Sequence, residues 1–169
     1  VLGDNNGHPN DLFTGNGDLE MVWLDNAGNL LPTSRMLGKS TADNAVWIEK
    51  DVICGGNNHY IIVGNDPDDI LVTMTDLSGT PVWARSIGST TNIETGAWAE
   101  MDANGLIHVV GSEFDVNTGV YSVILAQLDC NGNDNYRLKY TLSGYALTAT
   151  SATTFATAPG GPGIIYITG

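Results

Sequence analysis

Three loops of the sequence are rich in the oxygen groups that a hard cation such as Ca²⁺ prefers. They read "DNNGHPND" (4–11), "NDPDD" (65–69) and "SEFDVNTG" (112–119), and each follows a glycine that closes a short apolar run. Because the loops follow equivalent glycines, we expect them to lie on one face of the molecule, where their carboxylate and amide oxygens could bind Ca²⁺. The candidate ligands are Asp4, Asp11, Asp66, Asp68, Asp69 and Asp115. The alternative is that these are ordinary solvated loops between strands, which usually carry such residues.

A second set of aspartates, Asp25, Asp76, Asp102 and Asp129, favours turns over metal binding. Each is followed by Gly three positions later. The most metal-like example, "DCNGND" from Asp129, has Asp134 at the sixth position and Tyr140 at the twelfth. An EF-hand loop requires Gly and Glu at those two positions. An Asp that caps nearby backbone N–H groups, followed by a Gly with positive φ, is instead typical of a tight turn between strands.

Side chains that perform catalysis form no recognisable pattern. The three histidines (His8, His59 and His108) show no HxH or HExxH spacing, and no G-x-S-x-G stretch exists. Cys54 and Cys130 are the only cysteines, too few for the Cys₄ or Cys₃His set of a structural zinc site. Their spacing indicates no disulfide framework. We therefore predict a protein that is not an enzyme and has no cofactor apart from the candidate Ca²⁺.

Composition restricts the partners and the location. Six Lys and Arg against 19 Asp and Glu give a formal net charge of −13, which repels nucleic acid and anionic lipid. No apolar run reaches the roughly 18–20 residues that span a bilayer, so membrane insertion is not predicted. Few Lys, many Asn, Thr and Gly, and no initiator Met favour an extracellular or cell-surface protein whose export signal is removed or lies upstream.

The elements that must position these loops repeat about every 50 residues. The segments "EMVWLDNAGNLL", "LVTMTDLSGTPVW" and "VILAQLDCNGNDNY" each place a D-x-x-G turn between two apolar runs. Their turn glycines, Gly28, Gly79 and Gly132, are 51 and 53 positions apart. A second type of hairpin lies between them and ends on a β-branched run closed by Gly at Gly64, Gly111 and Gly169, and "VLG" supplies the same ending at the start. No window shows a helical stripe, so the prediction is all-β.

Four short antiparallel strands in about 50 residues is the size of one β-propeller blade. We predict one blade over about 45–88 and another over about 96–142, with a hairpin of the outer type at 17–38 and one of the inner type at 145–169. The predicted repeats are about 4–64, 65–111 and 112–169, within one segment covering 1–169. Three blades are too few to close a ring, because propellers use about four to eight.

One stretch carries a family resemblance. "DDILVTMTDLSGTPVWARSIG" followed by "GAWAEMDANGLIHVVGSE" (69–113) resembles the bacterial beta-propeller repeat family, in which a D-x-x-G-x-x-x-W hairpin precedes a second hairpin ending on V-x-G. The copy at 18–64 is looser, and the copy at 121–169 has "NDNYRLKY" in place of the Trp. Such repeats occur in large exported or surface proteins as binding, adhesion or scaffold modules. The family has no shared catalytic residues to carry over.

We therefore expect a non-catalytic extracellular module that binds proteins, or glycans, at a cell surface. The alternative is a self-assembling subunit whose terminal strands pair between chains, so that two copies form a ring of about six blades or a series forms a fibre. Unpaired terminal strands are templates for pairing with another chain. Further copies of the chain are therefore candidate partners. The four Trp residues are expected to pack between strands rather than form a sugar-binding platform.

Overall fold

The computed structural model describes residues 2–5, 18–37, 44–155 and 164–169, and this part of the chain is all-β. The strands are β1 (Leu2–Asn5), β2 (Asp18–Leu24), β3 (Leu30–Leu37), β4 (Asn44–Cys54), β5 (Asn57–Asp66), β6 (Asp69–Asp76), β7 (Pro81–Ile87), β8 (Ile93–Met101), β9 (Ile107–Asp115), β10 (Val120–Leu128), β11 (Asp134–Tyr140), β12 (Ser151–Phe155) and β13 (Ile164–Thr168). None of the described segments is a helix with the length and apolar character needed to cross a bilayer.

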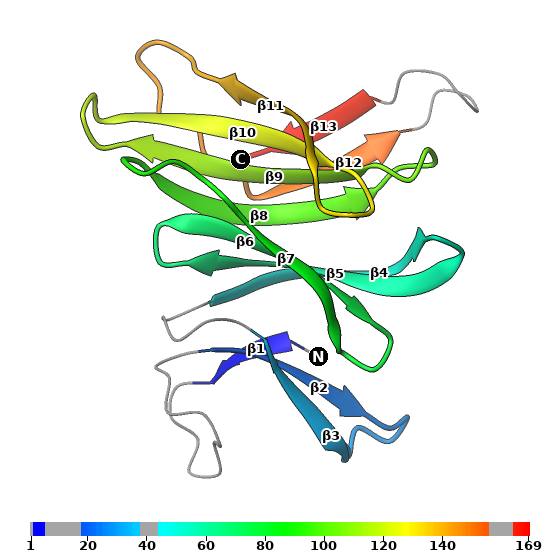
Figure 1. Ribbon diagram of the computed structural model, residues 1–169. Coiled ribbons are helices and arrows are strands. Elements are labelled where there is room, and N and C mark those ends of the chain that lie inside the picture. Colours follow the sequence, from blue (N-terminus) through cyan, green and yellow to red (C-terminus); the bar gives the residue numbers. More distant parts are fainter. Residues whose placement is uncertain (1, 6–17, 38–43, 156–163) are drawn as a thin grey trace.

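The described strands form four antiparallel sheets that lie one above another (Figure 1). Sheet A has the order β1-β2-β3, sheet B β4-β5-β6-β7, sheet C β8-β9-β10-β11 and sheet D β12-β13. Sheets B and C occupy the two ranges predicted for four-stranded units, and the predicted terminal hairpins are β2–β3 and β12–β13. The all-β antiparallel class is therefore confirmed, whereas the arrangement of the sheets around a propeller axis stays a prediction.

Strand register shows that the sheets repeat one another residue by residue. In sheets A, B and C the glycines that close the second type of hairpin, Gly3, Gly64 and Gly111, pair with Glu20, Leu71 and Ile124. These three partners are 51 and 53 positions apart, the same spacing as the turn glycines. β1 therefore holds the place in sheet A that β5 and β9 hold in sheets B and C.

The D-x-x-G segments fold as tight turns, as predicted. In the turn after β10, the Asp129 N–H donates to the Asn133 carbonyl, and the Gly132 N–H donates to the Asp129 carbonyl, both at 3.0 Å. One carboxylate oxygen of Asp129 accepts the N–H groups of Asn131 and Asn133 at 2.8 and 2.9 Å. The turns that begin at Asp25, Asp76 and Asp102 repeat this pattern. The glycine that ends each turn has a φ of 74–84°.

These turn carboxylates are held in their ionised form. The side-chain hydrogen bond from Asn133, followed by the backbone bonds, lowers the pKa of Asp129. The Ser78 hydroxyl has the same effect on the pKa of Asp76, and the Asn29 amide on that of Asp25. The Asp102 carboxylate differs because burial raises its pKa, but the bonds from His108 and the backbone outweigh burial, and the net pKa is lowered. The four carboxylates are engaged in their own turns, which explains their recurrence without a metal.

Among the residues that the structure describes, three apolar clusters hold the sheets together. The largest joins sheets B and C and includes Ile61, Met74, Ile107 and Leu128, all of which are fully buried. A second cluster joins sheets C and D, and a third joins sheets A and B. All four Trp side chains pack in or against these clusters, which confirms the packing role predicted for them.

A disulfide between Cys54 and Cys130 corrects the sequence-based interpretation that no disulfide framework is present. Cys54 ends β4 in sheet B, and Cys130 lies in the turn between β10 and β11 of sheet C. Their Cα atoms are 5.6 Å apart although 76 positions separate them in the sequence. Stacking the two sheets brings the end of one strand over a turn of the next sheet. The disulfide therefore links neighbouring repeats.

Candidate interaction surface

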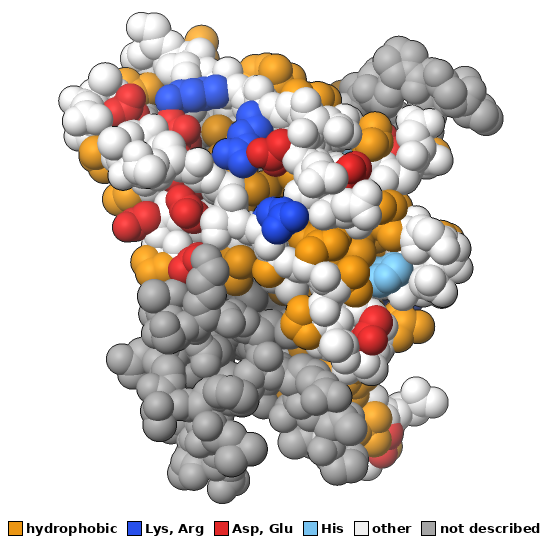
Figure 2. Space-filling view, in the orientation of Figure 1, with side chains coloured by type: hydrophobic (Ala, Val, Ile, Leu, Met, Phe, Trp, Pro, Cys, Tyr) orange, Lys and Arg blue, Asp and Glu red, His pale blue; other side chains and the backbone are white. Residues whose placement is uncertain are grey.

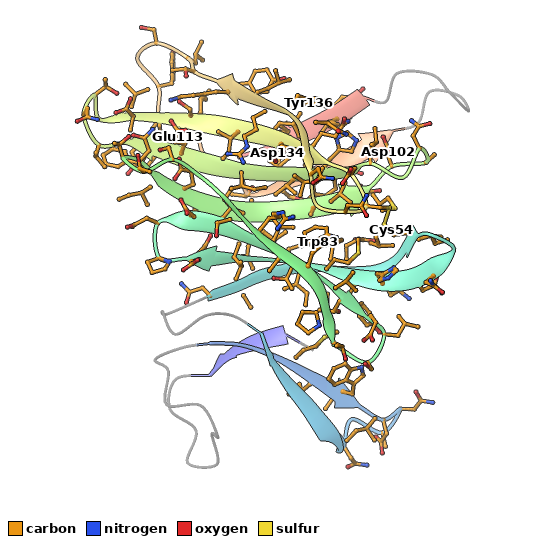
Figure 3. The ribbon with its side chains drawn as sticks, in the orientation of Figure 1. Cys54, Trp83, Asp102, Glu113, Asp134 and Tyr136 are labelled. Atoms are coloured by element: carbon orange, nitrogen blue, oxygen red, sulfur yellow. A yellow bond between two sulfur atoms is a disulfide. The ribbon has the colours of Figure 1, made fainter. Side chains whose placement is uncertain are left out.

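The edge strand β7, which we call the outer strand of sheet B, docks on the Asp129–Gly132 turn of sheet C. This contact shows how one repeat covers the next. The Trp83 indole N–H donates to the Cys130 carbonyl at 2.9 Å, and the Arg85 Nε–H donates to the Gly132 carbonyl at 3.1 Å. The ring of Trp83 lies so close to Gly132 that an added Cβ would be 2.9 Å from it. Figure 3 places Trp83 and Cys54 at this level between the two sheets.

The equivalent face of sheet C is largely uncovered. A shift of 53 positions carries Trp83, Arg85 and Ile87 of β7 onto Tyr136, Leu138 and Tyr140 of β11. At matched positions, Tyr140 is 47% exposed whereas Ile87 is buried, and Tyr136 is 38% exposed whereas Trp83 is half-buried. Tyr136 lies one sheet higher in the stack than Trp83 (Figure 3). The strand that should dock on the next repeat therefore has no complete repeat to dock on among the described residues.

A groove of about 640 Å³ lies along this face. Tyr136, Leu138 and Tyr140 line it from β11, and Ile165 and Ile167 line it from β13. Its remaining lining residues are Val123, Leu125, Ala146, Leu147, Thr148, Thr168 and Gly169. Apolar and aromatic side chains thus dominate the groove, which is typical of a binding surface rather than of a solvated loop.

The groove runs beside a sheet edge. In the described part of sheet D, β13 pairs with β12 alone, whereas the corresponding strands β5 and β9 each have a strand on both sides. An edge strand offers backbone N–H and C=O groups to an incoming strand. The groove supplies the apolar contacts and the edge supplies the hydrogen bonds that an extended segment needs.

The structure brings together part of the predicted Ca²⁺ site. Asp66, Asp68 and Asp69 line a second groove, of about 520 Å³, together with Val116 from the loop that begins at Asp115. The loops after Gly64 and Gly111 therefore do meet. Asp115 caps its own turn by accepting the N–H groups of Asn117 and Thr118. Asp4 lies in β1, its side chain is not described, and Asp11 lies outside the described residues.

Within the described ranges, no group of three or more His, Cys, Asp or Glu side chains is arranged to hold a metal ion. The loop carbonyl of Asp68 accepts the Glu94 N–H at 2.7 Å, and the Asp66 carbonyl accepts the Asp68 N–H at 2.6 Å. The Asp66 and Asp68 carbonyl oxygens, which could have been cation ligands, thus already accept backbone hydrogen bonds. The Ca²⁺ site stays a prediction from sequence.

One buried carboxyl beside this groove was not identified from the sequence. Glu94, in β8, is 1% exposed, and its Oε2 has no hydrogen-bond partner among the described residues. Burial raises the pKa of Glu94, and hydrogen bonds from Ser89 only partly oppose this effect. The charges of Glu113 and Asp69 raise the pKa further. Glu94 lines a small cavity of about 220 Å³ that Glu113 and Lys139, which form an ion pair, also line.

The chain matches no protein-family model and no curated protein sequence. The relation to the bacterial beta-propeller repeat family therefore stays a resemblance carried by the motifs at 69–113. The groove was missed by sequence analysis because neither β11 nor β13 contains a recognised motif. The signal that could have revealed it was the repeat spacing itself, which aligns Tyr136 with the docked Trp83.

Replacing Glu94 with Gln should stabilise the protein at neutral pH. The folded-state pKa of Glu94 is raised, so the folded state binds more protons than the unfolded state, and its stability falls as pH rises through that pKa. Gln removes the ionisation. We expect wild type and E94Q to be similar at pH 4 and below, and E94Q to be more stable at pH 7 by on the order of 1 kcal/mol.

Urea unfolding at a series of pH values measures this difference. D129N is the control, because hydrogen bonds in its turn lower the pKa of Asp129, so loss of that carboxylate should reduce stability at neutral pH. An E94Q variant that is less stable than wild type at pH 7 would contradict the prediction.

Proposed function

We propose that this chain is a segment of β-propeller repeats that acts as a non-catalytic interaction module outside the cell. Two successive four-stranded meanders, with matching register and the same turn in each, support propeller-type blades. Their face-to-face stacking, in which the outer strand of one docks on a turn of the next, is the packing that a propeller needs.

The observation that carries the proposal is the apolar groove beside the edge strand β13. It combines three adjacent side chains of one strand face, Tyr136, Leu138 and Tyr140, with a sheet edge along which a strand could add. This combination favours a protein partner that binds in an extended conformation over a glycan, because a glycan cannot pair with the backbone of β13.

The disulfide supports an extracellular location. Disulfides form and persist in oxidising compartments and are rare in the cytosol. The Cys54–Cys130 bond joins sheet B to sheet C. Outside the cell, where the environment is not reducing, this cross-link would persist. A net charge of −13, with Asp and Glu side chains spread over the face shown in Figure 2, agrees with a soluble surface exposed to salt-containing fluid.

Selection of displayed peptides on the purified chain tests the proposal. We expect enrichment of extended peptides with apolar residues at alternate positions, and binding weakened about tenfold or more by Leu138→Asp, because a charge in the groove must be desolvated. Val82→Asp is the matched control. Val82 is an exposed apolar residue of the outer strand of sheet B and lies outside the groove.

Peptides that bind wild type and L138D equally well would show that the groove is not the binding surface. A glycan array probed with the same three proteins tests the alternative ligand class. Glycan binding that L138D abolishes and V82D preserves would assign the groove to glycans and contradict the strand-binding proposal.

The second candidate function is self-assembly, and one observation favours it. The glycine of the D-x-x-G turn is buried in sheets B and C but exposed in sheet A. Among the described residues, the turn of sheet A therefore has no strand docked on it. At the other end of the stack, β11 has no such turn to dock on. Chains associating through these ends would form a ring or a fibre.

A further inference from the structure

We propose that the groove beside β13 receives the β2–β3 hairpin of a second copy of this chain, with the Asp25–Gly28 turn seated against Tyr136. This inference rests on the proposed interaction function and names its partner. It follows from the internal contact between sheets B and C, in which Trp83 seats against the Asp129–Gly132 turn.

The receiving half of that contact is vacant in sheet A. Gly79 and Gly132 are buried, whereas Gly28 is exposed. A Cβ added to Gly132 would meet the Trp83 ring, but one added to Gly28 would have no described atom within 4 Å. The Asp25–Gly28 turn has the same hydrogen bonds and the same positive φ as the docked turn. It is therefore built like the docked turn but has no strand seated on it among the described residues.

The docking half of the contact is open at the other end of the stack. β11 holds the place of β7, and its Tyr136, Leu138 and Tyr140 face the groove. Sheets A and D lie at opposite ends of the stack in Figure 1, so one chain cannot bring its own two halves together in this conformation. Two copies can, in a head-to-tail contact that leaves one half open at each outer end and so continues or closes into a ring.

The order of the strands shows which strand must be displaced when two copies associate. β13 corresponds to β5 and β9, and in sheet A that place is held by β1, which pairs with β2 over four residues. β13 pairs with β12 over five residues. The closing glycine of the repeat follows β13, as Gly169, and lies within β1, as Gly3. In the complex, β13 of one copy replaces β1 of the other beside β2, which places Gly169 opposite Glu20. Because β1 of the same copy already occupies this place, it competes with β13 and weakens the association.

The chemistry of the open strand predicts a weaker contact than the internal one. Tyr136 can donate one hydrogen bond to the carbonyl of Asn26, which corresponds to Cys130, as the Trp83 indole does. Leu138 replaces Arg85 and donates none. Two copies that each carry a formal charge of −13 also repel each other, so added salt should strengthen the association.

Sedimentation velocity of the 169-residue chain, from micromolar to millimolar concentration and at low and high salt, tests the inference. We expect reversible association of wild type and an about tenfold tighter association of the double variant Tyr136→Trp/Leu138→Arg, which copies the docked strand of sheet B. Leu138→Asp should weaken association by about tenfold or more, and Val82→Asp should leave it unchanged. Circular dichroism of each variant checks that the fold is retained.

Two results would overturn the inference. Wild type and the double variant could both stay monomeric throughout, or association could be lost in V82D and unaffected in L138D. The peptide selection separates this failure from that of the proposed function. Peptides that bind in a Leu138-dependent manner to a monomeric chain would leave the interaction module standing and exclude the second copy as its partner.

Discussion

Replacing Cys130 with serine should lower the free energy of unfolding by about 4 kcal/mol, the largest effect we expect from a single substitution. The disulfide closes a loop in which 76 positions separate its two ends, and a loop of that length restricts the unfolded chain strongly. The bond also joins sheet B to sheet C beside the contact between Trp83 and Gly132. Urea unfolding of wild type and C130S, without reductant, measures the loss.

Three controls separate the cross-link from the cost of the serine itself. C54S and the double variant C54S/C130S should lose about as much stability as C130S, because either change removes the whole cross-link. Wild type in reductant should unfold at nearly the same urea concentration as the double variant. Equal stability of oxidised and reduced wild type would show that the disulfide does not stabilise the fold.

Local signals in the sequence were sufficient to predict the strands and turns. The Asp and Gly of each D-x-x-G segment perform their roles within five residues, since Asp129 caps the N–H groups of Asn131 and Asn133 and Gly132 adopts a positive φ. The spacing of the glycines then placed each strand in its sheet, because a repeat of fixed length carries equivalent residues to equivalent register positions. Structure that depends on neighbours in the sequence was therefore predictable.

Features that depend on stacking were not predictable in this way. Cys54 ends β4 of sheet B, and Cys130 lies in the turn between β10 and β11 of sheet C, so nothing local to either residue indicates its partner. Glu94 lies in an ordinary strand sequence, and it is buried where residues of sheet B, such as Ile87 and Gly88, lie beside residues of sheet C. Of the candidate Ca²⁺ ligands, Asp66, Asp68 and Asp69 do lie around one groove. Asp115 illustrates the limit of a composition argument, since its carboxylate caps its own turn.

Replacing Gly132 with alanine should cost about 3 kcal/mol, whereas the same change at Gly28 should cost only about 1 kcal/mol. The two glycines end equivalent turns with similar φ values of 74° and 84°, so the backbone penalty of a left-handed alanine is common to both. Only at Gly132 would the new Cβ lie 2.9 Å from the Trp83 ring. The ring must then shift, which strains or breaks its hydrogen bond to the Cys130 carbonyl.

The difference between the two variants therefore measures how much the docking of one repeat on the next contributes to stability, with the turn itself cancelled. Urea unfolding at a protein concentration low enough to avoid association gives both values, and equal losses would show that the Trp83 contact is not stabilising. At high protein concentration, comparing G28A with wild type also tests the association between copies. If Tyr136 of another copy seats against the Asp25–Gly28 turn, G28A places a methyl group in that contact, and it should weaken association even though it leaves the isolated chain nearly intact.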